Sequence, residues 1–204
     1  MAKCDTYLSK CIQVDCANPQ YSGVAPEALI FNKDQISYTI SHNKIAAITA
    51  NTYVPEGETT PVAYCGGYTV QQMGNKPFDG SQTEFVEGTY GNKFNHTIVL
   101  AVPDNGPEIS ENIIDKFANG RFVVILTNDY VHGGTNASDN KYQVYGAQKG
   151  LRASSIVREV WGDNDSYWIV TFVEENATSS AIFFFDTDAS TTETAYENIP
   201  KCSC

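Results

Sequence analysis

The stretch KFNHTIVLAVP, residues 93–103, reads as one unbroken β-strand and decides the fold class of this chain. Successive side chains of a strand point to opposite faces, so one face is mostly apolar while the other begins polar and ends apolar. The first face holds Phe94, His96, Ile98, Leu100 and Val102, and the second holds Lys93, Asn95, Thr97, Val99 and Ala101. Such a strand needs cover on both sides towards Pro103, which predicts a partner. We interpret His96 as a strand residue that a neighbour satisfies at a seam, in preference to a functional site.

Size and composition favour a single β-dominated domain. A chain of 204 residues can build one β-rich domain with its own core, and 42% hydrophobic against 18% charged residues is a globular mixture. Twelve Tyr and ten Phe, with abundant Thr and Val, favour strands over helices.

The net charge of -11 argues against a protein that grips DNA, because such a protein needs a basic surface to displace counterions from phosphates. The charge is uneven, since residues 159–200 contain nine acids and no Lys or Arg. This run is either a solvated acidic face or a surface that repels a polyanion. The nine acids are Glu159, Asp163, Asp165, Glu174, Glu175, Asp186, Asp188, Glu193 and Glu197.

The beginning of the chain, MAKCDTYLSKC, has no apolar signal core, and no stretch approaches the roughly 20 apolar residues of a membrane span. We therefore expect no membrane insertion, and a protein that stays in the cytosol or leaves it without a classical signal.

Six cysteines stand at positions 4, 11, 16, 65, 202 and 204, so five of them crowd the two ends of the chain. This crowding suggests that the ends meet in space. The spacings match no common zinc knuckle, and a reducing cytosol disfavours crosslinks. Free thiols are the preferred prediction, with disulfides and a metal site as alternatives.

Along the chain we expect an N-terminal extended arm at residues 1–27, a main domain at 28–187 and a C-terminal segment with a Cys-rich end at 188–204. Besides 93–103, β-like runs stand at 28–32, 36–40, 44–50, 61–70, 83–90, 121–127, 141–146, 151–162, 165–174 and 180–186. Within 61–70, the pair Gly66-Gly67 predicts a bulge or a close backbone approach.

Two helices are expected. Residues 107–119 carry Pro107 at the first helical position and are followed by the stop signal Gly120. A shorter helix, capped by Asp188, is expected within 188–199. The loops 71–82 and 128–140 lack periodicity and are candidate contact elements.

No motif of catalysis is visible. His42 falls on a turn, His96 on a strand and His132 on a loop, without a shared pattern. Asp186, Asp188, Ser190, Thr194 and Glu197 have the spacing of a calcium loop, but Thr191 stands where the sharp turn requires glycine. We predict a protein that is not an enzyme, with no catalytic, cofactor-binding or metal-binding residue.

One combination of segments resembles a known family. The segments are CANP (16–19), ALIFNKDQI (28–36), NKFNHTIVLAV (92–102), GRFVVIL (120–126) and YQVYGAQKGLRASSIVRE (142–159). Together they resemble the tail tube (major tail) proteins of long-tailed bacteriophages, especially those that infect Bacteroidetes. The likeness spans most of residues 16–186, whereas the two long loops and the Cys-rich end do not match.

The resemblance implies a β-sandwich or barrel-like subunit with one flanking α-helix. Six copies would form a ring whose inner strands close into a β-barrel, and stacked rings would form the tube for genome delivery. The implied partners are the tape measure, tail terminator and distal tail proteins, with DNA passing transiently through the lumen. The implied location is the virion tail, after assembly in the host cytoplasm.

Two further expectations complete this interpretation. Some of the nine acids would face the lumen and keep DNA sliding, and the arm and loops 71–82 and 128–140 would connect the rings. The alternative is a receptor- or glycan-binding β-sandwich module, for which Trp161, Tyr167 and Trp168 would supply part of an aromatic platform.

Overall fold

The computed structural model describes residues 23–72, 76–88, 91–103, 106–129, 140–158 and 167–202. The described residues are mainly β, with 47% in strands and 16% in helices, which confirms the predicted mainly β fold class. Residues 1–22 of the expected N-terminal arm lie outside the described residues, and its last residues already belong to the first strand, which begins at Val24.

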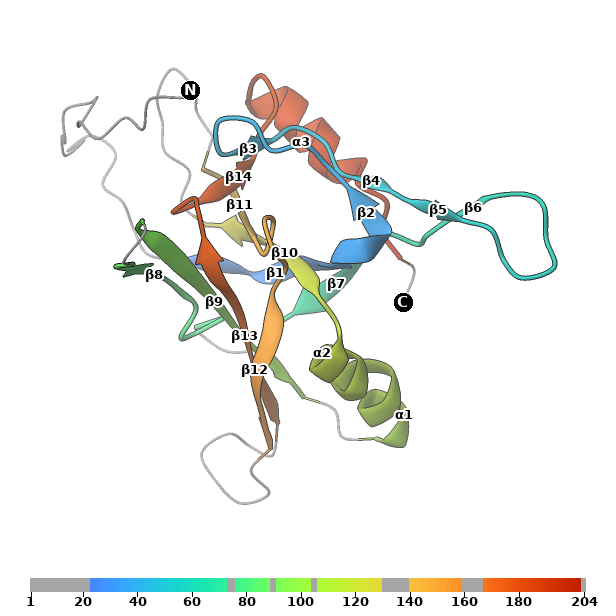
Figure 1. Ribbon diagram of the computed structural model, residues 1–204, viewed down its shortest axis with the longest axis horizontal. Helices are drawn as coiled ribbons and strands as arrows, with labels where there is room; N and C mark the ends of the chain where they lie inside the picture. The colour runs from blue at the N-terminus through green and yellow to red at the C-terminus, as the bar shows by residue number, and fades with distance from the viewer. Residues whose placement is uncertain are drawn as a thin grey trace.

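Most strands belong to two sheets (Figure 1). The six-stranded sheet has the order β3 (Lys44–Ile45), β14 (Ile182–Phe184), β11 (Tyr142–Tyr145), β10 (Phe122–Asn128), β1 (Val24–Asn32) and β7 (Gly67–Gln71). The four-stranded sheet has the order β12 (Arg152–Arg158), β13 (Trp168–Ala177), β9 (Lys93–Val102) and β8 (Gln82–Val86). Neighbouring strands are antiparallel except β3 and β14. Two short ribbons pair β2 (Ile36–Ser37) with β4 (Thr49–Ala50), and β5 (Thr52–Tyr53) with β6 (Val62–Ala63).

The six-stranded sheet lies between two cores because its central strands are apolar on both faces. In β10, Phe122, Val124 and Leu126 point into the core shared with the four-stranded sheet. Val123 and Ile125 point the other way, into a second core that includes residues from β3 and from the C-terminal helix region. The run FVVIL, residues 122–126, is therefore buried on both sides, as the unbroken apolar pattern indicated.

The predicted helix at 107–119 is confirmed as three consecutive segments, α1 (Pro107–Ile109), the π-helical η2 (Ser110–Ile114) and α2 (Asp115–Asn119). It covers the first core, where the Phe117 ring packs edge-on against Phe122 and Phe172 at centroid distances of 5.3 and 5.1 Å. No helix among the described residues combines the length and apolarity needed to cross a membrane.

The predicted C-terminal helix is also present, as α3 (Ala189–Glu197). The Asp188 carboxylate accepts a hydrogen bond of 2.8 Å from the Thr191 backbone N–H, which is the expected N-cap. The helix lies on the second core, where the Tyr196 ring stacks on Tyr142 at 3.9 Å.

The predicted strand at 61–70 is interrupted at the glycine pair. Gly66 has a φ of +107°, and a Cβ there would lie 2.2 Å from the carbonyl oxygen of Pro200. The close backbone approach that Gly66-Gly67 predicted is thus made to the C-terminal segment. Gly67 donates to the Pro200 carbonyl at 2.9 Å and accepts from the Cys202 N–H at 2.8 Å, so Pro200–Cys202 lies beside the start of β7.

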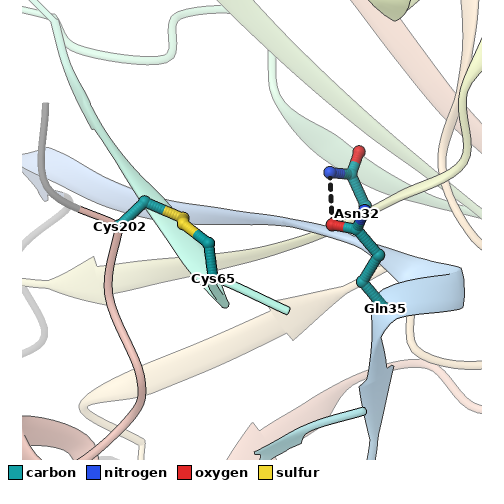
Figure 2. The surroundings of a disulfide bond; sticks show 4 residues. All are labelled: Asn32, Gln35, Cys65 and Cys202. Atoms are coloured by element: carbon teal, nitrogen blue, oxygen red, sulfur yellow. Dashed lines mark hydrogen bonds between the residues drawn. A yellow bond between two sulfur atoms is a disulfide. The ribbon is translucent and has the colours of Figure 1, made fainter. Parts of the chain in front are cut away.

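Cys65 and Cys202 form a disulfide across a sequence separation of 137 residues (Figure 2). The preference for free thiols is therefore wrong for these two residues. The backbone contacts at Gly67 bring the two Cα atoms to 5.2 Å, which is within the usual range for a disulfide. Figure 2 also shows the nearby Asn32–Gln35 hydrogen bond of 2.9 Å, which spans the turn η1 (Lys33–Gln35) between β1 and β2.

Loss of this disulfide should destabilise the fold, because the crosslink closes most of the chain into one loop. We expect Cys65→Ser and Cys202→Ser each to lower the free energy of unfolding by about 2–4 kcal/mol in urea titrations. The double variant should lose no more free energy of unfolding than either single variant. Reductant should lower the free energy of unfolding of the wild-type protein to the same value. A wild-type unfolding midpoint that reductant leaves unchanged would contradict this assignment.

Candidate functional site

His96 is a satisfied core residue, as predicted. Its side chain is buried, and Nε2 lies 3.0 Å from the backbone carbonyl of Ser179. Because a carbonyl can only accept, Nε2 carries the proton, and in the neutral ring Nδ1 accepts from the Thr83 hydroxyl at 3.0 Å. The ring also packs edge-on against Tyr145. Both ring nitrogens have partners, so His96 offers no free group for catalysis.

The other candidate side chains do not form a catalytic or metal site within the described ranges. His42 lies on a turn with a φ of 51°, and His132 lies outside those ranges. No group of three or more His, Cys, Asp or Glu side chains could hold a metal ion in the part of the chain that the structure describes. The residues with the spacing of a calcium loop, 186–197, form α3 and the segment directly before it, and Asp188 caps this helix.

The turn Gly146–Leu151, which we call the crossover turn, carries the chain from β11 in one sheet to β12 in the other. Gly146 and Gly150 have φ values of +79° and +88°, in the region that favours glycine. A Cβ on Gly146 would lie 2.4 Å from the Phe122 carbonyl oxygen. The motif VYG…GL that carried the family resemblance therefore has a local structural reason.

A buried carboxylate closes the crossover turn. Glu174 on β13 is 2% exposed and accepts hydrogen bonds from the backbone N–H groups of Lys149 and Gly150. Leu151 then pairs with Phe122 through two backbone bonds of 2.8 and 2.9 Å. Glu174 thus joins the turn to the four-stranded sheet, which is a structural role.

Lys33 and Tyr38 lie beside the crossover turn. Lys33 Nζ donates to the Tyr38 hydroxyl at 2.6 Å and to the Ala147 carbonyl at 2.9 Å. Burial lowers the pKa of Lys33, an effect that the Glu174 charge opposes. Burial, with Glu174 as a second cause, raises the pKa of the Tyr38 hydroxyl. Since both groups already bond each other and the backbone, we assign them to the structure of the turn.

The acids expected to face a lumen fall in several places. Glu174 is buried in the crossover turn, and Asp188 caps α3. Glu193 on α3 binds Lys141 and Tyr142, and the bond from Lys141, together with that from Tyr142, lowers the pKa of its carboxyl. Of the nine, Glu159, Asp163 and Asp165 lie outside the described residues. The described acids of this run therefore do not form one continuous surface.

The loop 71–82, expected to be exposed, is attached to the body at both ends. The Gln72 side chain is buried and forms two hydrogen bonds, of 2.8 and 2.9 Å, with the backbone of Ala101. Ser81 accepts from the Val99 N–H at 3.0 Å, and Phe78 is buried in the first core. Side chains thus take the place of a neighbouring strand along the second half of β9. Residues 73–75, like most of loop 128–140, lie outside the described residues.

The four-stranded sheet has one packed face and one open face. Its packed face supplies Ile98, Leu100, Val170 and Phe172 to the first core. The opposite face carries mostly short or uncharged side chains that are partly or fully exposed. The cover that we expected on the second face of residues 93–103 is therefore incomplete among the described residues. Its members are Gln82, Glu84, Val86, Lys93, Asn95, Thr97, Val99, Ala101, Arg152, Ser155, Val157, Ile169, Thr171 and Val173.

The two edges of this sheet, β8 and β12, pair with no further strand among the described residues. Phe85 on β8 is 56% exposed and Val157 on β12 is 44% exposed, which is unusual for large apolar side chains. The edges also differ in charge. Strand β12 carries Arg152 and Arg158 and no acid, whereas β8 carries Glu84 and no base. The sequence predicted strands at 83–90 and 151–162, but not the strand order that makes β8 and β12 the edges.

Two of the three aromatic candidates for a glycan platform, Tyr167 and Trp168, are among the described residues, and both are half-buried. Trp168 packs against the first core, and the Arg158 guanidinium lies 5.9 Å from the centre of its ring. Trp161 lies outside the described residues. No family model, no curated protein and no solved structure matches this chain.

Removal of the Glu174 carboxylate should loosen the crossover turn. Glu174→Ala leaves the Lys149 amide without its acceptor, and we expect the free energy of unfolding to fall by about 1–3 kcal/mol in urea titrations. Glu174→Gln keeps an acceptor oxygen and should lose less. The exposed neighbour provides the control, because Glu175→Ala should leave the unfolding midpoint nearly unchanged. Equal midpoints for Glu174→Ala and Glu175→Ala would exclude this role.

Proposed function

We propose that this protein is the subunit of a bacteriophage tail tube, in which six copies form a ring and rings stack into a conduit for the genome. The observation that carries the proposal is the four-stranded sheet, whose edges β8 and β12 carry opposite charge and pair with no further strand among the described residues. Exposed sheet edges are pairing sites, and soluble proteins normally cover or block them. Pairing between copies would use both edges at once.

The strand directions suit this pairing. Because β8, β9, β13 and β12 alternate in direction, β8 and β12 run in opposite directions. Placing β12 of one copy beside β8 of the next therefore continues the antiparallel pattern without a break. Such a contact joins two different surfaces, and contacts of this type generate a closed ring when the rotation between copies closes, and a helical filament when it does not.

The charged and apolar side chains of β8 and β12 also favour pairing between these two edges. Glu84 on β8 and Arg152 on β12 lie on the same, open face of the sheet, so they would face each other across a joint between copies. Val157 on β12 and Val86 on β8 lie on that face as well. Repulsion between like edges would disfavour the wrong pairings.

The open face would line the lumen, because the rest of each subunit lies behind the packed face and could not fit inside the ring. Four strands from each of six copies exceed the roughly 16–18 strands that already enclose a water-filled channel. Short side chains such as Thr97, Ser155 and Thr171 leave the pore wide. Lys93 and Arg152 are the only cations among the members of this face given above, so the lining offers few groups to hold phosphates.

A charge exchange between the edges tests the proposal. Glu84→Arg places a base on β8 that matches Arg152, and Arg152→Glu places an acid on β12 that matches Glu84, so either variant alone would bring like charges together at these two positions of the joint. We expect each variant alone to remain unassembled, and an equimolar mixture to form rings in which the variants alternate. Negative-stain microscopy and sedimentation would detect the rings.

The folded state of each variant is checked by its unfolding midpoint, which should stay close to that of the wild-type protein because both side chains are exposed. The proposal fails if both variants assemble alone, or if the mixture stays unassembled while the wild-type protein forms rings.

A further inference from the structure

The β7 edge of the six-stranded sheet is covered at its start by the short segment Pro200–Cys202, which we call the C-terminal strap. The strap runs parallel to β7. Gly67 bonds to both ends of the strap, because it donates to the Pro200 carbonyl at 2.9 Å and accepts from the Cys202 N–H at 2.8 Å. No strand lies beyond β7 among the described residues, so the strap takes the place of a further strand.

The noncovalent contacts that hold the strap are weak. Its first two residues are exposed, and the buried apolar side chain nearest to it in sequence is Ile199, which lies in the second core directly before the strap. Lys201 Nζ lies 5.2 Å from the centre of the Tyr196 ring. Chain ends that depend on a few hydrogen bonds and one exposed cation–π contact fray readily. The Cys65–Cys202 disulfide is therefore the contact that keeps the strap on β7.

The disulfide lies where small molecules can reach it. Cys65 is exposed and Cys202 is half-buried, and Figure 2 shows the bond at the start of β7. A thiolate reaches the more exposed sulfur first, and attack on Cys65 Sγ makes Cys202 the leaving thiolate. The first step of reduction thus releases the sulfur that belongs to the strap.

Release of the strap would uncover a pairing edge. Gly67 would lose both of its backbone partners on this side. Thr69, two residues further along β7, directs its N–H and C=O to the same side, because alternate residues of an edge strand do so, and it has no backbone partner there among the described residues. Tyr68 between them is 45% exposed. An uncovered edge of this kind is a template for pairing with another chain.

We propose that the Cys65–Cys202 disulfide is a redox switch that determines whether the C-terminal strap covers the β7 edge. In the oxidised protein the strap is fixed and the edge is covered. In the reduced protein the strap leaves Gly67 and the edge is open. This inference does not rest on the proposed function, because β7 belongs to the six-stranded sheet and not to the sheet whose edges would join copies.

The co-reactants are low-molecular-weight thiols and disulfides of the glutathione type. One thiolate forms a mixed disulfide with Cys65 and releases Cys202, and a second thiolate attacks the small-molecule sulfur of this mixed disulfide and releases Cys65. Two electrons and two protons pass to the protein, and the two small thiols leave as one disulfide. The reverse exchange closes the switch.

Amide hydrogen exchange measured by NMR tests the release of the strap. In the oxidised protein, the bond to Pro200 should protect the Gly67 amide. In excess reduced glutathione this amide should exchange within about threefold of an unstructured amide, whereas the Tyr68 amide, which points to β1, should stay protected. Glutathione disulfide should restore the protection of Gly67. A disulfide that excess reduced glutathione leaves intact would overturn the inference, as would a Gly67 amide that reduction leaves equally protected.

Two variants separate local release from a general loss of stability. Cys65→Ser and Cys202→Ser should each show the fast Gly67 amide without reductant, and reductant should not change it further. The Val124 amide is the reference, since β10 is paired on both sides. Local release predicts that Gly67 is at least about tenfold less protected than Val124. Equal protection of these two amides in the variants would mean that only global unfolding opens the strap, and the inference would fail.

Trypsin provides a second readout, because cleavage requires a segment that is free of the sheet. The bond after Lys201 should be cut at least about tenfold faster in the reduced protein than in the oxidised protein. Mass spectrometry after an acid quench and reduction would detect the loss of residues 202–204. Lys201→Gln is the control and should show no cut at this position. Equal rates of cleavage after Lys201 in the oxidised and reduced protein would contradict the switch.

Discussion

The structure depends on a buried carboxylate at the point where the chain passes from one sheet to the other. Glu174 accepts from the backbone of the crossover turn, and that turn needs Gly146 and Gly150 in conformations that other residues rarely adopt. Leu151 then pairs with Phe122, which fixes the start of β12 beside the six-stranded sheet. These contacts set the angle at which the four-stranded sheet leaves the body of the subunit.

The consequence of this arrangement is a sheet that is complete on one face and incomplete at its borders. Its packed face is filled by the first core, while β8 and β12, with exposed Phe85 and Val157, pair with no further strand in the part of the chain that the structure describes. A protein that functions as a monomer would be expected to block such edges with inward charges, proline or a covering loop. Here the charges on the two edges are of opposite sign, which favours pairing between copies over protection. The two-stranded ribbon of β5 and β6 also projects from the body of the subunit, and it exposes Tyr53, Val54 and Val62.

Local chemistry predicted much of the fold. The alternation in residues 93–103, the doubly apolar run at 121–127, the helix after Pro107 and the cap at Asp188 all follow from neighbours in sequence. The partition into two sheets did not, because it depends on pairings between distant segments. The Cys65–Cys202 disulfide was missed for the same reason, since only the folded chain brings Gly67 beside Pro200. Gln72 and Ser81 were read as loop residues, because nothing local shows that their side chains replace a strand beside β9.

The central claim is that the four-stranded sheet is completed by identical copies. The most direct measurement is the sedimentation of the purified wild-type protein over a wide range of concentration. We predict that the protein sediments as a 22.4 kDa monomer at low concentration, and that it assembles into a species of six copies and then into longer filaments as the concentration rises. A single 22.4 kDa species at every concentration, with its edges unpaired, would contradict it.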